Sequence, residues 1–269
     1  MVNVCRGDTM GFKEEIIEIY EARNILKSLV VKNLIGRYRS STLGFAWHFI
    51  VPAIMMFVYY IVFTQIRSNP IPEFWIYLAS GLFPFTFMTS NLSGSAGCII
   101  GNSGMVKKMY FPREIIVLAQ VISTFIVMLI GYVMVLGLVL ISGHTMTISL
   151  LMLPVLMILT LVFVTGYSLI LSAITVYVKD VQHLIGSITL AFFFITPMYF
   201  TIDDTAGLLN MIVWINPFTY FIESYHQIVY YGHLPEAWII VVCTTLSIMF
   251  MTIGTLIFKK LKKGFVERL

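Results

Sequence analysis

The stretch GMVKKMYFPREI, residues 104–115, interrupts a chain that is otherwise almost continuously apolar. It places two lysines, an arginine and a glutamate between hydrophobic runs that are each long enough to cross a membrane. Proline disfavours helix at the residue before it and suits the first position of a new helix, where its missing N–H costs nothing. The stretch therefore predicts a short helix, a sharp break at Phe111-Pro112, and a long apolar helix that begins at the proline.

The neighbouring residues are consistent with both helices. Asn102 or Ser103 can cap the short helix by accepting a backbone N–H bond. Glu114 lies in the first turn of the second helix, where the helix dipole stabilises an anion. From this chemistry alone, a positive loop that only fixes the orientation of the chain explains the stretch as well as a functional surface does.

The composition around this stretch is that of a membrane protein. Of the 269 residues, 59% are hydrophobic and only 11% are charged, whereas a soluble globule has about 25% charged residues. Cys98 and Cys243 fall inside apolar runs and show no metal or redox spacing. The N-terminal residues 1–24 contain no apolar signal region. We expect a single transmembrane domain, residues 1–269, whose insertion relies on internal spans.

Six segments are apolar over the roughly 20 residues that a membrane-spanning helix needs. They are residues 44–66, 74–100, 115–142, 148–178, 184–202 and 237–258. A further apolar stretch within 203–233 is split by Asn216-Pro217 and carries Glu223 and His226, which we place at an outer rim. Such short pieces favour re-entrant helices. The predicted fold class is all-α integral membrane, with six spans and re-entrant helices between spans five and six.

The positive charges favour cytoplasmic termini. With the N-terminus inside, every one of the 17 basic residues except Arg67 falls in a cytoplasmic segment, as expected of a multi-pass protein. A seventh span would move the basic tail, residues 259–269, to the outside. Before the first span, residues 12–36 place apolar side chains at mostly three- and four-residue steps. This pattern predicts an amphipathic helix on the cytoplasmic interface, or alternatively a plain membrane anchor.

Motifs for catalysis are missing from the sequence. It contains no G-x-x-x-x-G-K-[ST] phosphate loop, no G-x-S-x-G and no H-E-x-x-H. The six apolar segments hold no obvious central ionisable residue, which a proton-driven transporter would need. A partner ATPase is the simplest source of energy for transport. We therefore expect no catalytic residue, metal or cofactor in this chain, with ATP and Mg bound by the partner.

Five stretches of the sequence resemble one family of transporters. In chain order they are IGRYRSSTLGFAWHFIVP (35–52), MVKKMYFPREI (105–115), YVKDVQHL (177–184), ITPMYF (195–200) and INPFTYF (215–221). Together they resemble the type-2 ABC exporter permeases for O-antigen, capsule and teichoic acid polymers. Lys179 stands where that family has arginine before Asp180. The charge is kept, so the departure affects only bidentate pairing at that position.

The resemblance implies a subunit organisation and two sets of functional residues. It implies a homodimer that contacts a dimer of cytoplasmic ABC ATPase subunits and exports a lipid-linked polysaccharide across the bacterial inner membrane. The coupling segment, residues 102–114, would contact the ATPase through Met105, Val106, Lys107, Lys108, Met109, Tyr110, Phe111, Pro112, Arg113 and Glu114. A cytoplasmic gate near lipid phosphates would contain Arg37, Tyr38, Arg39, Ser40, Trp47, Lys179 and Asp180.

Aromatic and small residues allow two interpretations. The export function would place some aromatic rings along a sugar channel, namely Phe192, Phe193, Phe194, Tyr199, Tyr220, Phe221 and Tyr225. The alternative is a belt of aromatic side chains at the membrane interface. Ser93, Gly97 and Gly101 recur every four residues, a spacing that predicts close helix packing within one protomer or across a dimer.

Two other functional classes remain open at this point. A permease for a drug or a simple lipid would share the architecture. A membrane-embedded acyl or glycosyl transferase would turn over without any ATPase. Membrane lipids are expected contacts in every case, and no nucleic-acid partner is expected.

Overall fold

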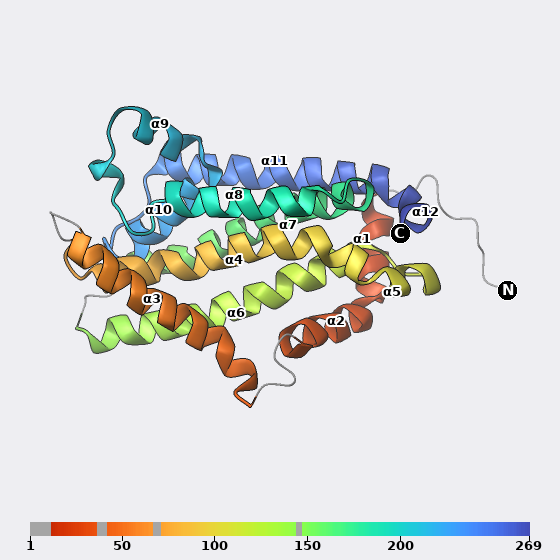
Figure 1. Ribbon diagram of the computed structural model, residues 1–269, viewed down its shortest axis with the longest axis horizontal. Coiled ribbons are helices and arrows are strands. Elements are labelled where there is room, and N and C mark those ends of the chain that lie inside the picture. The colour runs from red at the N-terminus through yellow and green to blue at the C-terminus, as the bar shows by residue number, and fades with distance from the viewer. Residues whose placement is uncertain (1–11, 37–41, 67–70, 144–146) are drawn as a thin grey trace.

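The computed structural model describes residues 12–36, 42–66, 71–143 and 147–269, and within these ranges every regular element is a helix. The all-α fold class is therefore confirmed for the described chain. Figure 1 shows α4, α6, α7, α8 and α11 lying roughly along the long axis, with α3 crossing them obliquely. The bounds of the long helices are α3 (Trp47–Ile66), α4 (Phe74–Gly101), α6 (Glu114–Ile141), α7 (Leu153–Tyr177), α8 (Val181–Ile195) and α11 (Ala237–Leu261).

Shorter elements cover the two ends of this bundle. The short α-helices are α1 (Phe12–Glu21), α2 (Arg23–Gly36), α5 (Ser103–Lys108), α9 (Gly207–Ile215), α10 (Pro217–Val229) and α12 (Phe265–Arg268). Single 3₁₀ turns are η1 (Gly44–Ala46), η2 (Ile148–Met152), η3 (Ile202–Asp204) and η4 (Lys262–Gly264). The predicted interface helix over 12–36 is thus divided at Ala22 into α1 and α2. α2 packs on the bundle against α6, with Leu29 and Val30 buried.

In the described part of the chain, three helical segments are long and apolar enough to cross a membrane, namely Glu114–Ile141, Ile148–Tyr177 and Ala237–Arg268. Two shorter apolar helices, Phe49–Gln65 and Val181–Ile195, accompany them. The chain is therefore a membrane protein with several apolar helices, and the count of six spans stays a prediction. The predicted fifth span, residues 184–202, extended too far, since α8 ends at Ile195. The residue before Pro197 is Thr196, whose backbone is extended, as proline favours for the residue that precedes it.

Helix α4 lies at the centre of the bundle. This position explains why it carries buried polar residues. It packs against α3, α6, α7, α8 and α10, so most of its surface faces protein. Its wholly buried polar residues include Ser80, Asn91 and Ser95. Asn91 Nδ2 donates to the Phe87 carbonyl and to Thr124 Oγ1, each at 2.8 Å. Polar side chains are tolerated at membrane depth when neighbouring helices supply such partners.

Helices α7 and α11 pack closely along an extensive contact. Gly166 of α7 faces the backbone of Phe250 and Met251, and Gly254 of α11 faces the backbone of Gly166. Ser247 Oγ, on the same face of α11, donates to the Leu159 carbonyl at 2.9 Å. Small residues on facing helices let backbones approach in this way. The pair therefore forms a tightly packed unit along the bundle.

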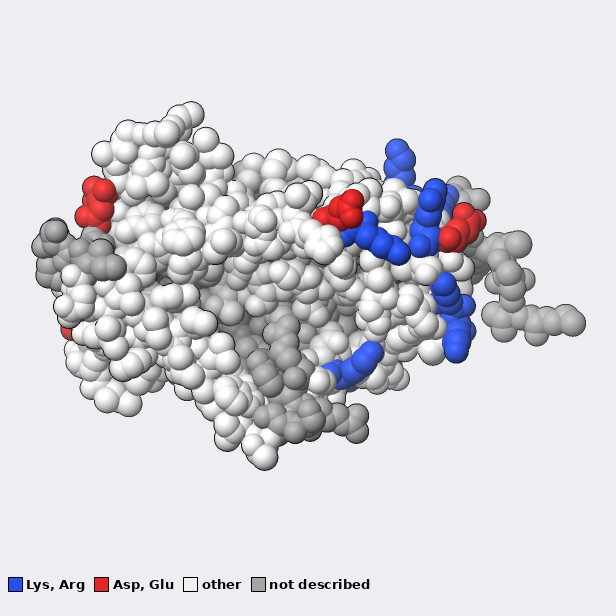
Figure 2. Space-filling model, in the orientation of Figure 1, with Lys and Arg blue, Asp and Glu red and all other residues white. Residues whose placement is uncertain are grey.

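The two ends of the bundle differ in charge. In the part of the chain that the structure describes, the lysines and arginines lie on α1, α2, α5, the start of α6, the α7–α8 turn and the segment from the end of α11 onward. Figure 2 shows them gathered at one end of the molecule. The described residues of the opposite end include Glu73, Asp203, Asp204 and Glu236 but no lysine or arginine. We refer to these as the basic end and the acidic end.

Candidate functional site

The coupling segment folds as a short helix, a break and a long helix. α5 ends at Lys108, and Met109 is extended, with φ −126° and ψ 140°. α6 then begins at Glu114, two residues after Pro112, whose carbonyl accepts the Ile115 N–H at 3.1 Å. The predicted break at Phe111-Pro112 is confirmed. The predicted start of the second helix at Pro112 is wrong by two residues, since Pro112 and Arg113 form a turn that leads into it.

One side of this segment is anchored and the other faces solvent. Val106 and Phe111 are buried in an apolar cluster that includes Leu29 and Val30 of α2, and each such burial contributes about 1.5–3 kcal/mol. Lys107, Lys108, Met109 and Tyr110 are exposed, and Tyr110 is 91% exposed. These four residues, 107–110, form what we call the tip. It projects from a fixed base at the basic end of the molecule.

The predicted cap of the short helix by Asn102 or Ser103 is wrong for Asn102, and Ser103 is already the first residue of α5. Asn102 stands at the N-cap position of α5, but its side chain makes no capping bond. Its Nδ2 donates instead to the Cys98 carbonyl at 2.8 Å, and its Oδ1 accepts from Lys32 Nζ at 3.0 Å. The side chain therefore ties α2 to the junction between α4 and α5. This partner lies 70 residues away, so local capping rules could not identify it.

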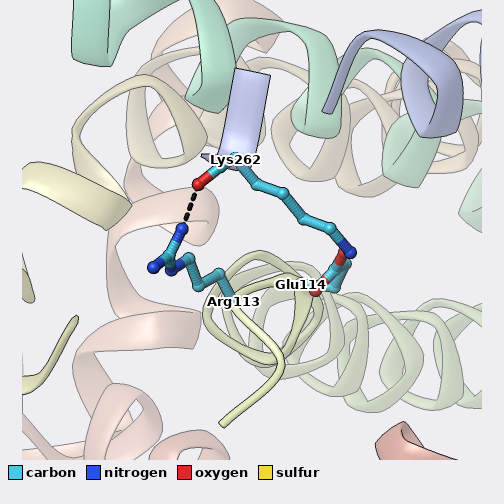
Figure 3. A network of polar contacts seen from close by, with 3 residues as sticks. All are labelled: Arg113, Glu114 and Lys262. Carbon is cyan, nitrogen blue, oxygen red and sulfur yellow. Dashed lines mark hydrogen bonds and ion pairs between the residues drawn. The ribbon is translucent and has the colours of Figure 1, made fainter. Parts of the chain in front are cut away.

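A polar network joins the start of α6 to the C-terminal segment (Figure 3). Lys262 Nζ forms an ion pair with Glu114 Oε1 at 2.6 Å, and the two side chains are 26% and 15% exposed. Arg113 Nη1 donates to the Lys262 carbonyl. The sequence placed Glu114 in the first turn of α6 and assigned both Arg113 and Glu114 to contact with a partner, but it predicted no bond from either residue to a distant part of the chain. The structure shows that both also bind their own chain, about 150 residues away.

The predicted gate residues are placed only in part. Arg37, Tyr38, Arg39 and Ser40 lie outside the described residues. Trp47 lines a cleft of about 590 Å³ between α2, α3, α4 and α6. Its polar lining includes Lys32, Asn33, Thr86, Ser90, Gln120, Ser123 and Thr124. Lys179 and Asp180 are exposed on the α7–α8 turn, a different part of the basic end.

The seven predicted channel aromatics do not share one surface. Phe221 is wholly buried and stacks on Phe163 with ring centroids 4.7 Å apart. Tyr225 is also wholly buried, with its hydroxyl 3.1 Å from Thr160 Oγ1. Both are core residues in this structure, which corrects their assignment to a channel. They lie on α10, which the bundle buries on nearly every side, and an aromatic pattern alone does not distinguish core from channel.

The other aromatic candidates lie nearer the surface. Phe194 is 59% exposed, while Phe192, Phe193 and Tyr220 are half-buried. Tyr199 is buried, stacks on Phe63 of α3 at 4.2 Å between ring centroids, and donates its hydroxyl to the Phe194 carbonyl at 3.0 Å. It therefore connects the end of α8 to α3.

Glu223 and His226 are buried, which corrects their predicted place at an outer rim. His226 lies 2.8 Å from Ser80 Oγ through Nδ1 and 2.9 Å from the Pro197 carbonyl through Nε2. Glu223 Oε1 accepts from Gln227 Nε2 at 3.1 Å. Within the described ranges, no group of three or more His, Cys, Asp or Glu residues is arranged to hold a metal ion. His226 therefore joins α10 to α4 and to the segment after α8, whereas Glu223 bonds to Gln227 on its own helix.

Comparison with known proteins now decides the family. Residues 25–230 match the model of the ABC-2 type transporter family. The chain belongs to this family. The matched residues run from α2 to the end of α10, and they include the coupling segment, the cleft and the break after α8.

Curated relatives cover almost the whole chain. An O-antigen export system permease protein RfbA from Myxococcus xanthus is 29% identical over 93% of this chain and 97% of its own length. A protein of the same name from Klebsiella pneumoniae is 28% identical over 91% of this chain and 94% of its own length. The recognition from five short stretches is thereby confirmed, and ABC-2 permeases of this kind are transport subunits.

Proposed function

We propose that this chain is the membrane-spanning permease subunit of an ATP-driven exporter of a lipid-linked polysaccharide. The polymer would be of the O-antigen, capsular or teichoic type, and it would cross the bacterial inner membrane. Membership of the ABC-2 family and the names of the relatives support this assignment. The chain would work as a homodimer, form the path through the membrane, and leave ATP and Mg binding to separate ATPase subunits.

The observation that carries the proposal is the exposed tip on its buried base. An ATPase can move a permease only through a surface that it can reach and that is firmly attached to the bundle. The tip meets the first condition because residues 107–110 are exposed, and the second because Val106 and Phe111 are buried beside it. Two lysines next to Met109 and Tyr110 favour an acidic partner surface with an apolar pocket.

Reversing both charges at the tip should uncouple export. In the variant Lys107→Glu/Lys108→Glu we expect export to fall at least about tenfold, because like charges facing each other at an interface oppose docking. The base of the segment is unchanged, so the amount of inserted permease should stay the same. Export is measured as polymer at the cell surface, and insertion as tagged permease in membranes.

A matched variant separates docking from net charge. Lys27→Glu/Lys260→Glu carries the same change in charge on two exposed lysines of the basic end outside the tip, and should export normally. Normal export by the tip variant would refute the assignment of residues 107–110 as the docking surface.

The cleft beside Trp47 fits the proposed gate. Its lining joins Lys32 of the basic end to amide and hydroxyl groups such as Gln120 and Thr124 on α6. A cation and polar groups of this kind suit a phosphate-bearing lipid head group better than its hydrocarbon chain. We propose that the gate involves this cleft, with Lys179 and Asp180 at the separate α7–α8 turn.

The charge asymmetry predicts which end faces the cytoplasm. Cytoplasmic segments are enriched in lysine and arginine, so the basic end should lie inside and the acidic end outside. A cysteine at Asp203 should react with a membrane-impermeant maleimide on intact spheroplasts, whereas one at Lys107 should react only after permeabilisation. Cys5 is replaced by serine in both, and the buried Cys98 and Cys243 serve as the unlabelled background. The reverse pattern would overturn this orientation.

A further inference from the structure

We propose that the C-terminal segment, residues 262–269, is a positioning element that links the coupling segment to α11. Through this link, a displacement of the tip would reach the α7–α11 pair. The inference rests on the proposed function, because only a docked ATPase would displace the tip. It adds to that function a second, C-terminal route by which the permease receives the displacement.

The first observation is that Lys262 makes two contacts with two consecutive residues at the start of α6. Its side chain pairs with Glu114, and its carbonyl accepts from Arg113. Figure 3 shows the two residues reaching Lys262 from the same turn at the start of α6. One contact uses the side chain and the other the backbone, so the turn holds both the position and the direction of η4. Arg113 and Glu114 follow the tip within a few residues, so a displacement of the tip would also displace these two residues.

The second observation is that the C-terminal segment is anchored to α7 and α11 rather than hanging free. Phe265 is wholly buried and meets Phe258 of α11 edge to face, with ring centroids 5.5 Å apart. Tyr177, at the end of α7, donates its hydroxyl to the Leu261 carbonyl at 2.9 Å. Arg113 Cζ also lies 5.9 Å from the centre of the Phe265 ring. The polar link and the aromatic anchor therefore meet at one place.

The third observation is the rigidity of the elements beyond the anchor. α7 and α11 touch backbone to backbone at Gly166 and Gly254, so one cannot shift without the other. The coupling segment has a separate connection to α2 through Phe111, Val106 and the bond between Lys32 and Asn102. Loss of the link to Lys262 would leave that connection in place. The tip should then still dock while part of its displacement is lost.

Glu114 has capacity for a further donor. Its Oε2 is buried and has no hydrogen-bond partner among the residues that the structure describes. Arg113 comes from the preceding position and carries five donors on its guanidinium. The ion pair with Lys262 thus uses one carboxylate oxygen of Glu114 and leaves the other as a buried acceptor.

The test is a charge swap in the full permease, expressed with its ATPase. Lys262→Glu and Glu114→Lys each place two like charges together, and each should lower export about tenfold, since changes along a coupling route alter it by a factor of roughly 2 to 30. ATP hydrolysis by the purified complex should persist, because the tip is intact. The double variant Glu114→Lys/Lys262→Glu restores opposite charges and should regain export to within about threefold of the unaltered chain.

Controls separate positioning from folding and from net charge. Lys260→Glu changes the charge two residues before Lys262, at an exposed position, and should export normally. The amount of permease in membranes is measured with an N-terminal tag, and the swap must restore export at equal amounts of protein. Normal export by both single variants, or a swap that stays as defective as they are, would overturn this proposal. If the unaltered chain neither retained an ATPase nor exported, the proposed function itself would fail.

Discussion

Replacing Gly254 with valine should prevent the permease from forming a stable bundle. A Cβ atom at this position would overlap the carbonyl oxygen of Gly166, and its carbonyl carbon would lie 3.0 Å away. These are backbone atoms of a neighbouring helix, so no side chain can rotate away to make room. The same overlap arises from the other helix, because a Cβ at Gly166 would meet the backbone of Phe250 and Met251. The two helices would have to separate.

The expected cost follows from the packing that this separation disrupts. Overpacking a core costs about 1–3 kcal/mol when side chains can adjust, and more when they cannot. Separation of α7 from α11 would also break the bond from Ser247 Oγ to the Leu159 carbonyl. We expect Gly254→Val to lower the free energy of unfolding by more than about 3 kcal/mol. In practice this means little monodisperse protein after detergent extraction, measured by size-exclusion chromatography.

Gly137 provides the matched control. It lies within α6, and a Cβ there has nothing within 4 Å. Gly137→Val should therefore extract and elute like the unaltered chain, and Gly137→Ala should be neutral or slightly stabilising because alanine favours helix over glycine by up to about 1 kcal/mol. Equal behaviour of Gly254→Val and Gly137→Val would contradict the close contact between α7 and α11.

Local signals predicted most of the helix positions. Proline marked the break between α5 and α6, and Asn216-Pro217 divided the outer stretch into α9 and α10. At that point Asn216 caps α10 by accepting the Phe218 N–H at 3.0 Å, which a local rule anticipates. Apolar length indicated α6, α7 and α11 as spans. These features depend on residues a few positions apart, so the sequence displays them directly.

Contacts between distant segments could not be predicted in the same way. The stripe of Ser93, Gly97 and Gly101 suggested close packing within one protomer or across a dimer. In the described chain a Cβ at Gly97 would lie 3.3 Å from Gln182 Nε2, a Cβ at Gly101 has nothing within 4 Å, and packing across a dimer stays a prediction. The close contact uses Gly166 and Gly254 instead, which come from separate helices and form no repeat in the sequence. The pair of Glu114 and Lys262 likewise joins positions 148 residues apart. Spacing along one helix says which residues share a face, but not which helix covers that face.

His226 shows the same limit for a polar residue. Because it lies three residues from Glu223 on a short helix, the sequence predicted an exposed side chain. In the structure His226 is completely buried. The Pro197 carbonyl can only accept, so Nε2 carries the proton, and Nδ1 lies 2.8 Å from Ser80 Oγ, which donates to the Tyr77 carbonyl at 2.7 Å. Tyr77 stacks on the ring with centroids 3.9 Å apart and donates its own hydroxyl to the Phe200 carbonyl at 2.7 Å. One imidazole thus joins α4, α10 and the segment after α8.

Truncation of this ring should be the most costly change at the acidic end of the bundle. His226→Ala removes both hydrogen bonds and leaves a cavity, because the ring fills the space beside Gly81, where a Cβ would lie 2.8 Å from its Cε1 atom. Cavity creation in a core costs about 2–5 kcal/mol, so we expect roughly 3 kcal/mol and a melting temperature lower by roughly 6–12 °C. The loss is measured by heating detergent-solubilised permease and following the monodisperse fraction.

A second histidine provides the control. It tests whether the loss of stability is specific to His226 or follows from any histidine substitution at this end of the bundle. His233 lies at the same end but is exposed, and substitutions at exposed positions usually change stability by less than about 0.5 kcal/mol. His233→Ala should therefore melt with the unaltered chain. If His226→Ala also did so, the two bonds of the imidazole would contribute little to stability, and the main contact of the segment after α8 with α4 would be Tyr77, whose hydroxyl also donates to the carbonyls of Pro197 and Phe200. Tyr77→Phe in the His226→Ala background would then produce the loss that the single variant lacked.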